Sequence, residues 1–282
     1  MTEFNQNPLA KHFRQPAIYL KLPSGGKYWP ENSLDLPISG EIPVFPMTVK
    51  DEITLRTPDA LLNGSGIVQV IHSCCPNIKD AWMAPSIDMD SILIGLRIAS
   101  YGHEMEMETN CPKCQEKNLY GLDLRTALES IQCPDYDIPI EADDLKIMLK
   151  PQPYEQTNKT NLLGYEEQRI IQNINDAGLS EEDKVKVIAE QMQKLINITL
   201  DLLAKSTLYI EVGQDVKVTN YDHIKEYYQN SESKITRLIQ ARVEELAKQA
   251  SIKPYEVQCE NCQNRFELAV NFDYASFFAV GF

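Results

Sequence analysis

Four of the seven cysteines fall into two pairs that share the C-x2-C spacing. The pairs are Cys111-Pro-Lys-Cys114 and Cys259-Glu-Asn-Cys262. A tight turn at this spacing points two sulfurs at one ion, and two such turns complete the tetrahedron that zinc prefers. Because four thiolates leave no open coordination position for water or substrate, a site of this kind is structural rather than catalytic. The spacing therefore predicts one structural zinc per chain.

The segments on both sides of each pair alternate polar and apolar residues, as short strands do. Residues 104–108 lead into the first pair and residues 119–124 follow it, while 256–259 lead into the second pair and 266–272 follow it. This pattern is typical of a zinc ribbon whose two hairpins are separated by a long insertion, here 259 − 114 = 145 positions.

The alternatives to a metal site are two reduced dithiols or a redox-active pair of the thioredoxin kind. A redox motif would place one pair at the start of a helix, in surroundings that lower the thiol pKa, whereas strands are expected around both pairs. The residue after each second cysteine is Gln115 or Gln263, where many knuckles use glycine, and this departure weakens the expectation of tight knuckle geometry. In a reducing compartment, paired cysteines still favour metal over disulfides.

The other cysteines and the histidines show no further ligand spacing. His72 with Cys74 and Cys75 could form a second metal site, but free cysteine is more often a small buried hydrophobe, and we expect the same of Cys133. The four histidines lack the spacing of a metalloprotease, and no phosphate loop, dinucleotide loop or nucleophile elbow is complete. The sequence therefore predicts a protein that is not an enzyme.

The elements that would position the first cysteine pair begin with short strands. Residues 18–22 alternate like a strand and run into the turn cluster Pro23-Ser-Gly-Gly26. Residues 42–47 could form a second strand, and their two prolines place it at a sheet edge.

Helical periodicity follows. Thr48 and Asp51 fit a capping box at the start of a first helix. Asp88 or Asp90 is expected to cap a largely buried helix that contains Ile92 and Leu96. A further short helix is expected between these two, around residues 67–71.

Beyond residue 124 the chain changes character. Apolar residues recur at helical spacing over residues 185–202 and again over 235–246, and a hairpin with Gly213 in its turn is expected between them at 207–218. We therefore divide the chain into a flexible N-terminal arm (1–17), an α+β domain that ends in the first knuckle (18–124), a mainly helical insertion (125–253), and the second knuckle with an aromatic tail (254–282). The expected fold class is α+β: a mixed helical domain with short strands, a split four-cysteine zinc ribbon and a helical insertion.

Composition limits the partners. The chain has 282 residues, 43% of them hydrophobic, and a formal net charge of −14. A surface this acidic repels phosphate backbones and anionic lipids, so neither nucleic acid nor membrane is an expected partner. The first twenty residues do not resemble a signal peptide, and no apolar run is long enough to span a bilayer. We expect a cytosolic protein that docks on basic protein surfaces.

Five segments of the first half stand out by their order along the chain. They are Leu22-Pro-Ser-Gly-Gly-Lys-Tyr28, Pro46-Met-Thr-Val-Lys-Asp-Glu52, Thr57-Pro-Asp-Ala-Leu-Leu-Asn-Gly64, Val70-Ile-His-Ser-Cys-Cys-Pro-Asn-Ile-Lys-Asp80 and Asp90-Ser-Ile-Leu-Ile-Gly-Leu-Arg-Ile-Ala-Ser-Tyr-Gly102. In this order they resemble tailed-phage baseplate hub proteins of the T-even type. The resemblance covers about residues 20–124 and extends to the C-terminal knuckle, while the insertion is only loosely covered. Members of the family are hub components or hub-assembly chaperones, so the resemblance implies a binding role.

This resemblance implies other phage baseplate and tail proteins as partners, no small-molecule substrate, and a location in the host cytoplasm during assembly or in the tail baseplate of the virion. An acidic zinc-ribbon adaptor that binds host transcription or replication machinery is the alternative function. For partner contacts we single out exposed aromatic residues, which can anchor in a pocket on a neighbour. They are Tyr28, Trp29, Phe277, Phe278 and Phe282. The opposing expectation is that these aromatic side chains fold back onto their own domain.

Overall fold

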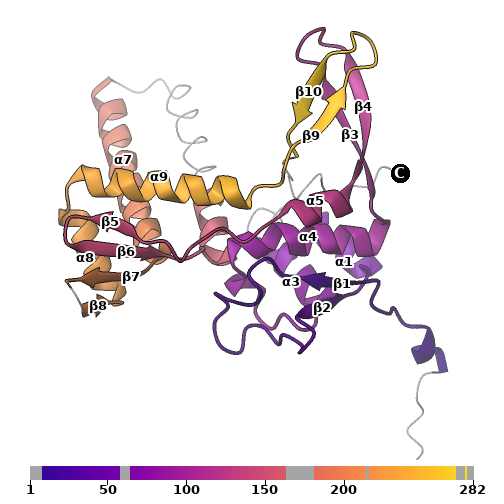
Figure 1. Cartoon of the computed structure of the whole chain (residues 1–282), viewed down its shortest axis with the longest axis horizontal. Coiled ribbons are helices and arrows are strands. Elements are labelled where there is room, and N and C mark those ends of the chain that lie inside the picture. The colour runs from indigo at the N-terminus through magenta and orange to yellow at the C-terminus, as the bar shows by residue number, and fades with distance from the viewer. Residues whose placement is uncertain (1–7, 58–63, 163–180, 214–215, 271–276, 278–282) are drawn as a thin grey trace, which may run out of the picture.

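The computed structural model describes residues 8–57, 64–162, 181–213, 216–270 and 277. Two lobes lie side by side, and a pair of β-hairpins projects from the N-terminal lobe (Figure 1). The expected α+β class is confirmed, because helices are combined with small antiparallel sheets and a four-cysteine cluster built from two separated pairs. The division of the chain at residues 17, 124 and 253 stays a prediction.

The N-terminal lobe is built around one buried helix, α4 (Ser86–Tyr101). The two-stranded antiparallel sheet of β1 (Ile18–Lys21) and β2 (Glu41–Val44) packs against it. Contact is close at Gly95, where an added Cβ would come within 3.3 Å of a methyl group of Leu20. The remaining elements of this lobe are α1 (Val49–Leu55), α3 (Ser65–Cys74), η2 (Ala81–Met83) and α5 (Leu124–Ser130).

The helix starts test the capping expectations directly. The capping box at α1 is confirmed: the Thr48 side chain accepts from the backbone N–H of Asp51, and the Asp51 carboxylate accepts from the backbone N–H of Thr48 at 2.7 Å. The expectation that Asp88 or Asp90 caps α4 is wrong, because Pro85 occupies the N-cap position and both aspartates lie inside the helix. Asp88 is fully buried and accepts hydrogen bonds from another segment of the chain, which contains Ser24 and Trp29.

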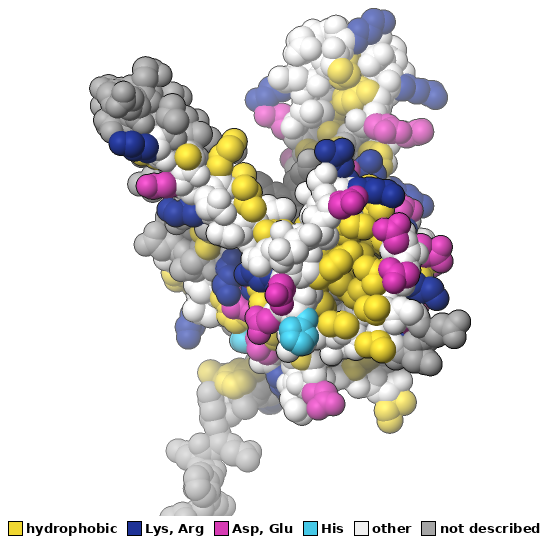
Figure 2. Space-filling model, turned by 90° about the vertical axis from the view of Figure 1, so that its left-hand side faces the viewer, with side chains coloured by type: hydrophobic (Ala, Val, Ile, Leu, Met, Phe, Trp, Pro, Cys, Tyr) yellow, Lys and Arg dark blue, Asp and Glu magenta, His cyan; other side chains and the backbone are white. Residues whose placement is uncertain are grey.

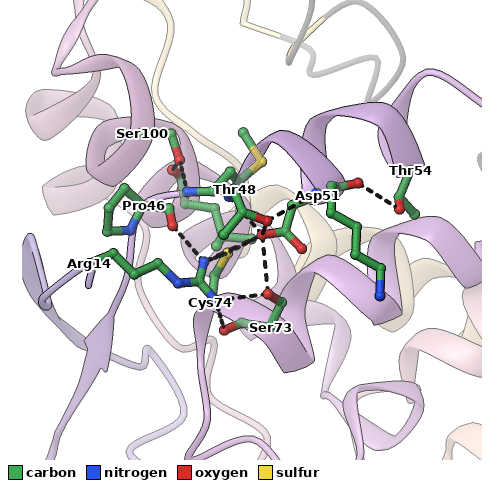
Figure 3. A network of polar contacts seen from close by, with 11 residues as sticks. Arg14, Pro46, Thr48, Asp51, Thr54, Ser73, Cys74 and Ser100 are labelled. Atoms are coloured by element: carbon green, nitrogen blue, oxygen red, sulfur yellow. Dashed lines mark hydrogen bonds and ion pairs between the residues drawn. The ribbon is translucent and has the colours of Figure 1, made fainter. Parts of the chain in front are cut away.

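The N-terminal arm is tied to the lobe by one arginine. The 3-10 helix η1 (Pro8–His12) lies away from the body, and Arg14 then inserts beside the facing ends of α1 and α3 (Figures 1 and 3). Its guanidinium donates to the carbonyl oxygens of Pro46 at 2.6 Å and Ser73 at 2.7 Å and reaches the Asp51 carboxylate at 3.3 Å. Of the expected flexible arm, residues 1–7 lie outside the described residues.

The second lobe combines helices with a four-stranded antiparallel sheet in the order β5-β6-β7-β8. Strand β5 (Ile140–Ala142), strand β6 (Leu145–Leu149) and a helical stretch at residues 154–162 come first. The long helix α7 (Glu181–Ser206) leads into the hairpin of β7 (Thr207–Val212) and β8 (Val216–Val218), and α8 (Tyr221–Asn230) and α9 (Ser233–Ala250) follow. The expected hairpin between two helices is confirmed, whereas α8, strand β5 and the pairing of the hairpin with β6 into one sheet were not foreseen.

Each lobe has its own hydrophobic core. Ile147, Ile210 and Ile239 are buried in the second lobe, while Ile42, Ile71 and Ile92 are buried in the first. Side chains of the second lobe dominate the view in Figure 2, where hydrophobic side chains also gather at the surface. Within the described residues, no helix has the length and apolar content required to cross a membrane.

Candidate metal centre

Both cysteine pairs lie at the tips of antiparallel hairpins, as the alternating patterns predict. The first hairpin consists of β3 (Glu104–Asn110) and β4 (Lys117–Asp123), and the second of β9 (Tyr255–Gln258) and β10 (Arg265–Leu268). In each hairpin the strand ends one residue before the first cysteine, and the return strand begins three residues after the second cysteine. The two hairpins lie side by side with their tips together (Figure 1).

The backbone of the two tips follows the same hydrogen-bond pattern. In the first tip, the N–H of Cys111 donates to the carbonyl of Glu116 at 2.9 Å, and the N–H of Gln115 donates back to the carbonyl of Cys111 at 2.9 Å. In the second tip, the N–H of Cys259 donates to Asn264 at 2.9 Å and Gln263 donates to Cys259 at 3.0 Å. Two segments far apart in the sequence thus fold into equivalent knuckles.

The glutamines after the second cysteines adopt the backbone conformation that glycine would provide. Gln115 has φ 59° and Gln263 has φ 56°, both in the left-handed region. A side chain in this region costs about 1–2 kcal/mol relative to the right-handed helical region. The knuckle turn is therefore formed despite the absence of glycine, at some expense of local strain.

The four sulfurs form a compact cluster. The Sγ atoms of Cys111 and Cys262 are 3.6 Å apart, those of Cys114 and Cys259 are also 3.6 Å apart, and all four lie within 4.8 Å of one another. The tetrahedral sulfur–sulfur edge around zinc is about 3.8 Å, given a zinc–sulfur bond of about 2.3 Å. A disulfide would require about 2.05 Å. The residues therefore fit a four-thiolate zinc ion, which would hold together segments 145 residues apart.

The pKa of the thiol differs from one cysteine of the cluster to the next. Backbone N–H groups, first that of Cys262, lower the pKa of Cys259 to about 6. Burial opposes ionisation of Cys111, but N–H donors from Cys114 and Lys113 outweigh it and lower its pKa. At Cys114 the N–H of Glu116 favours the thiolate, yet burial and the three neighbouring sulfurs raise its pKa to about 12. A bound dication would remove the unfavourable effect of the neighbouring sulfurs on the Cys114 thiolate, because it stabilises every thiolate it contacts.

An apolar layer joins the hairpins beneath the sulfurs. Leu122, Leu268 and Val270 are buried together. The rings of Tyr120 and Phe266 meet edge to face with centroids 6.1 Å apart. The cluster therefore lies on a packed base contributed by both hairpins.

The aromatic residues singled out near the N-terminus are half-buried rather than fully exposed. Tyr28, at φ 91°, packs edge to face against Tyr136 at 5.5 Å. The indole N–H of Trp29 donates to the buried Asp88 carboxylate at 2.7 Å, and Ser24 donates to the same group from its backbone N–H at 2.8 Å. Trp29 is thus fixed by its own domain and Tyr28 by contact with Tyr136 of the second lobe, but both keep part of their surface open.

Of the three C-terminal aromatic residues, only Phe277 is among the described residues. Phe277 is only 2% exposed and belongs to the core of the N-terminal lobe. The Arg97 guanidinium donates to the Phe277 carbonyl and lies 5.3 Å from the centre of its ring. Phe278 and Phe282 lie outside the described residues. Whether any of these aromatic side chains contacts a partner stays a prediction.

The remaining thiols test the expectations for core cysteines. Cys74 and Cys75 are fully buried in the N-terminal core, as expected. His72 accepts a hydrogen bond from the backbone N–H of Ala81 at 3.0 Å through Nε2. The expectation that Cys133 is a core thiol is wrong, because this residue is exposed in the non-helical segment that follows α5.

The structural role of three polar residues was not predicted from the sequence: Asp88, which was expected to be a helix cap, Arg97 and Asn118. Asp88 and Arg97 are buried in α4, and Asn118 is buried between the two knuckles. Each of them has at least one partner between 59 and 180 residues away along the chain. No local pattern around these residues indicates their distant partners.

Comparison with known proteins identifies the family. Residues 16–279 match the sequence family described as T4 bacteriophage base plate protein. No curated protein and no solved structure matches the chain significantly. The matched range contains both lobes and both cysteine pairs, so it extends across the insertion, which the segment resemblance covered only loosely. Since the match spans most of its length, this chain belongs to the T4 bacteriophage base plate protein family.

Proposed function

We propose that this protein is a structural or assembly protein of the hub of a contractile phage tail baseplate. The observation that carries the proposal is the family match over residues 16–279. Family membership implies other phage tail proteins as partners, and the hub resemblance of the first half narrows that set. The protein acts by binding other proteins, and nucleic acid, membranes and small-molecule substrates have no part in its function.

In this proposal the four-cysteine cluster holds one zinc ion whose role is architectural. Cys111, Cys114, Cys259 and Cys262 fill all four positions of a tetrahedral ion, so no position is left for a reacting water molecule. The ion fixes the two hairpins to each other and so fixes both ends of the second lobe. This rigidity suits a protein whose surfaces must meet several neighbours in a defined geometry.

The proposed partner contacts are the aromatic residues near the two ends of the chain. Tyr28 and Trp29 retain exposed surface next to a rigid buried anchor, which limits the entropy lost on binding. Phe278 and Phe282 are proposed to reach a neighbour from the C-terminal side. Phe277 can join them only if it leaves the core, which would cost the stability considered in the Discussion.

Phage genetics combined with mass spectrometry tests the hub role. Phage that carry a nonsense codon in this gene should produce incomplete or absent baseplates, and a plasmid copy should restore them. Proteomics of purified wild-type tails then separates the two versions of the role: a hub subunit is retained at constant stoichiometry, whereas an assembly factor is absent from mature tails. Normal baseplates in the nonsense mutant would refute the proposal.

The acidic charge supports one competing function, an adaptor that binds basic channels of host transcription or replication machinery. The formal net charge of −14 is consistent with mimicry of phosphate charge. Affinity capture of the tagged full-length protein from infected cells distinguishes the two. Recovery of tail proteins supports the baseplate role, and recovery of a host polymerase in their place supports the adaptor.

A further inference from the structure

We propose that Asn118 is the positioning residue of the metal centre: it fixes the register of the two knuckles and orients Cys259 toward the ion. The inference rests on the proposed zinc site and adds to it a residue that contacts no metal itself.

The side-chain amide of Asn118 bonds to both knuckles. Its Nδ2 donates to the carbonyl of Glu116 at 2.8 Å in its own hairpin and to the Sγ of Cys259 at 3.5 Å in the other. Its Oδ1 accepts from the backbone N–H of Glu260 at 3.1 Å. The side chain is buried, with 7% exposure for the residue, and both N–H bonds and the oxygen of its amide are used. One amide thus connects residues 141 and 142 positions apart.

This buried link has no counterpart at the equivalent position of the second knuckle. Asn118 stands seven residues after Cys111, and the equivalent position seven residues after Cys259 is Phe266. Phe266 packs on the ring of Tyr120 and donates no hydrogen bond from its side chain. The two knuckles have the same backbone geometry, so the polar link is an addition to the knuckle fold and not a requirement of it.

Two physical effects follow for the metal. An N–H donor to a ligand sulfur fixes the direction of that ligand and tunes its electron density, as hydrogen-bond partners of metal ligands do generally. In addition, a site whose halves are already in register loses less conformational entropy when the ion binds. Without Asn118, the ion would have to bring together two hairpins from distant parts of the chain by itself.

The chain offers a matched control. Asn261 also directs its Nδ2 at a ligand, the Sγ of Cys114, but at 4.0 Å and from an exposed position in the second knuckle. Replacing either asparagine by alanine removes one amide near one sulfur. The Asn118 change removes two bonds between the knuckles, to the Sγ of Cys259 and to the N–H of Glu260, whereas the Asn261 change removes one longer, exposed bond.

The test measures zinc affinity of the full-length protein by competition with a chromophoric chelator. We expect Asn118→Ala to weaken zinc binding about 10–100-fold, the usual cost of losing a hydrogen-bond partner of a metal ligand. Asn118→Asp keeps the oxygen that accepts from Glu260 but replaces the donor to sulfur with a negative charge, so it should weaken binding at least as much. Asn261→Ala should leave the affinity nearly unchanged.

A spectroscopic measurement separates orientation of Cys259 from general loosening. In the cobalt-substituted protein, Asn118→Ala should shift the sulfur-to-metal charge-transfer bands, while Asn261→Ala should not. Tryptophan fluorescence of the N-terminal lobe verifies that each variant is folded, and Asn118→Asp serves if the alanine variant is not. Wild-type zinc affinity together with an unchanged cobalt spectrum in folded Asn118 variants would overturn this inference alone. Failure of the unaltered protein to bind zinc would overturn the metal centre and the inference with it.

Discussion

Replacing Phe277 by alanine tests whether the end of the chain belongs to the N-terminal core. The side chain is 2% exposed and packs with Leu and Ile residues of that core. Buried Phe→Ala substitutions cost about 3–5 kcal/mol. We expect a loss of at least about 3 kcal/mol, the lower end of that range.

Tryptophan fluorescence provides a selective assay of this loss. The chain has two tryptophans, Trp29 and Trp82, and both pack against the N-terminal core. Urea denaturation followed by their emission therefore reports the unfolding of that lobe, and the midpoint should fall while the slope stays constant. Phe13, which is 58% exposed on the arm, supplies the control, since Phe13→Ala should change the free energy of unfolding by no more than about 0.5 kcal/mol.

A small effect would refute the placement of Phe277. If Phe277→Ala lowered the free energy of unfolding by less than about 1 kcal/mol, the side chain could not be part of a close-packed core. If the same variant also abolished baseplate assembly, Phe277 would instead act as a partner contact.

Three further predictions concern the hairpins and the buried carboxylate. Cys259→Ser should abolish zinc binding and raise hydrogen exchange in both hairpins together, and a rise confined to the second hairpin would contradict a shared ion. Gln115→Gly and Gln263→Gly should each raise the free energy of unfolding of the hairpins by about 0.5–1 kcal/mol, because glycine relieves the left-handed strain but has more entropy to lose; zinc-release temperatures that fall would contradict this. Burial raises the pKa of Asp88 against the opposing hydrogen bonds of partners such as Trp29, so the folded protein retains this proton to higher pH than the unfolded chain. The contribution of Asp88 to stability therefore decreases as pH rises from about 4 through the folded pKa, and Asp88→Asn should remove that slope from urea midpoints measured between pH 4 and 7.

Signals that act over a few residues were predictable from the sequence. The C-x2-C spacing and the flanking alternation located both hairpins, and the Thr48–Asp51 pair located the start of α1. Helix α5 was missed because Leu122 and Leu124 continue the alternation of β4, although Asp123 ends the strand by capping the helix that follows. The alternating pattern favoured a longer strand at this point, whereas Asp123 favoured the start of a helix, and the chain forms the helix.

Features that depend on distant partners could not be predicted in this way. Asp88 looked like a helix cap because aspartate is a favoured N-cap residue. In the folded protein it accepts hydrogen bonds from Ser24 and Trp29, which lie 64 and 59 residues away. Likewise, Arg97 donates to the carbonyl of Phe277, 180 residues away, and Asn118 donates to the sulfur of Cys259, 141 residues away. These contacts are set by tertiary packing, which local periodicity does not encode.

Metal analysis of the purified full-length protein is the most direct test of the central claim that one zinc ion joins the two hairpins. Native mass spectrometry combined with elemental analysis, on protein prepared under reducing conditions, should give close to one zinc per chain. Cys114→Ser and Cys262→Ser, which remove one ligand from each pair, should each lose the ion. A zinc content well below one per chain, or a content that either substitution leaves unchanged, would contradict the account.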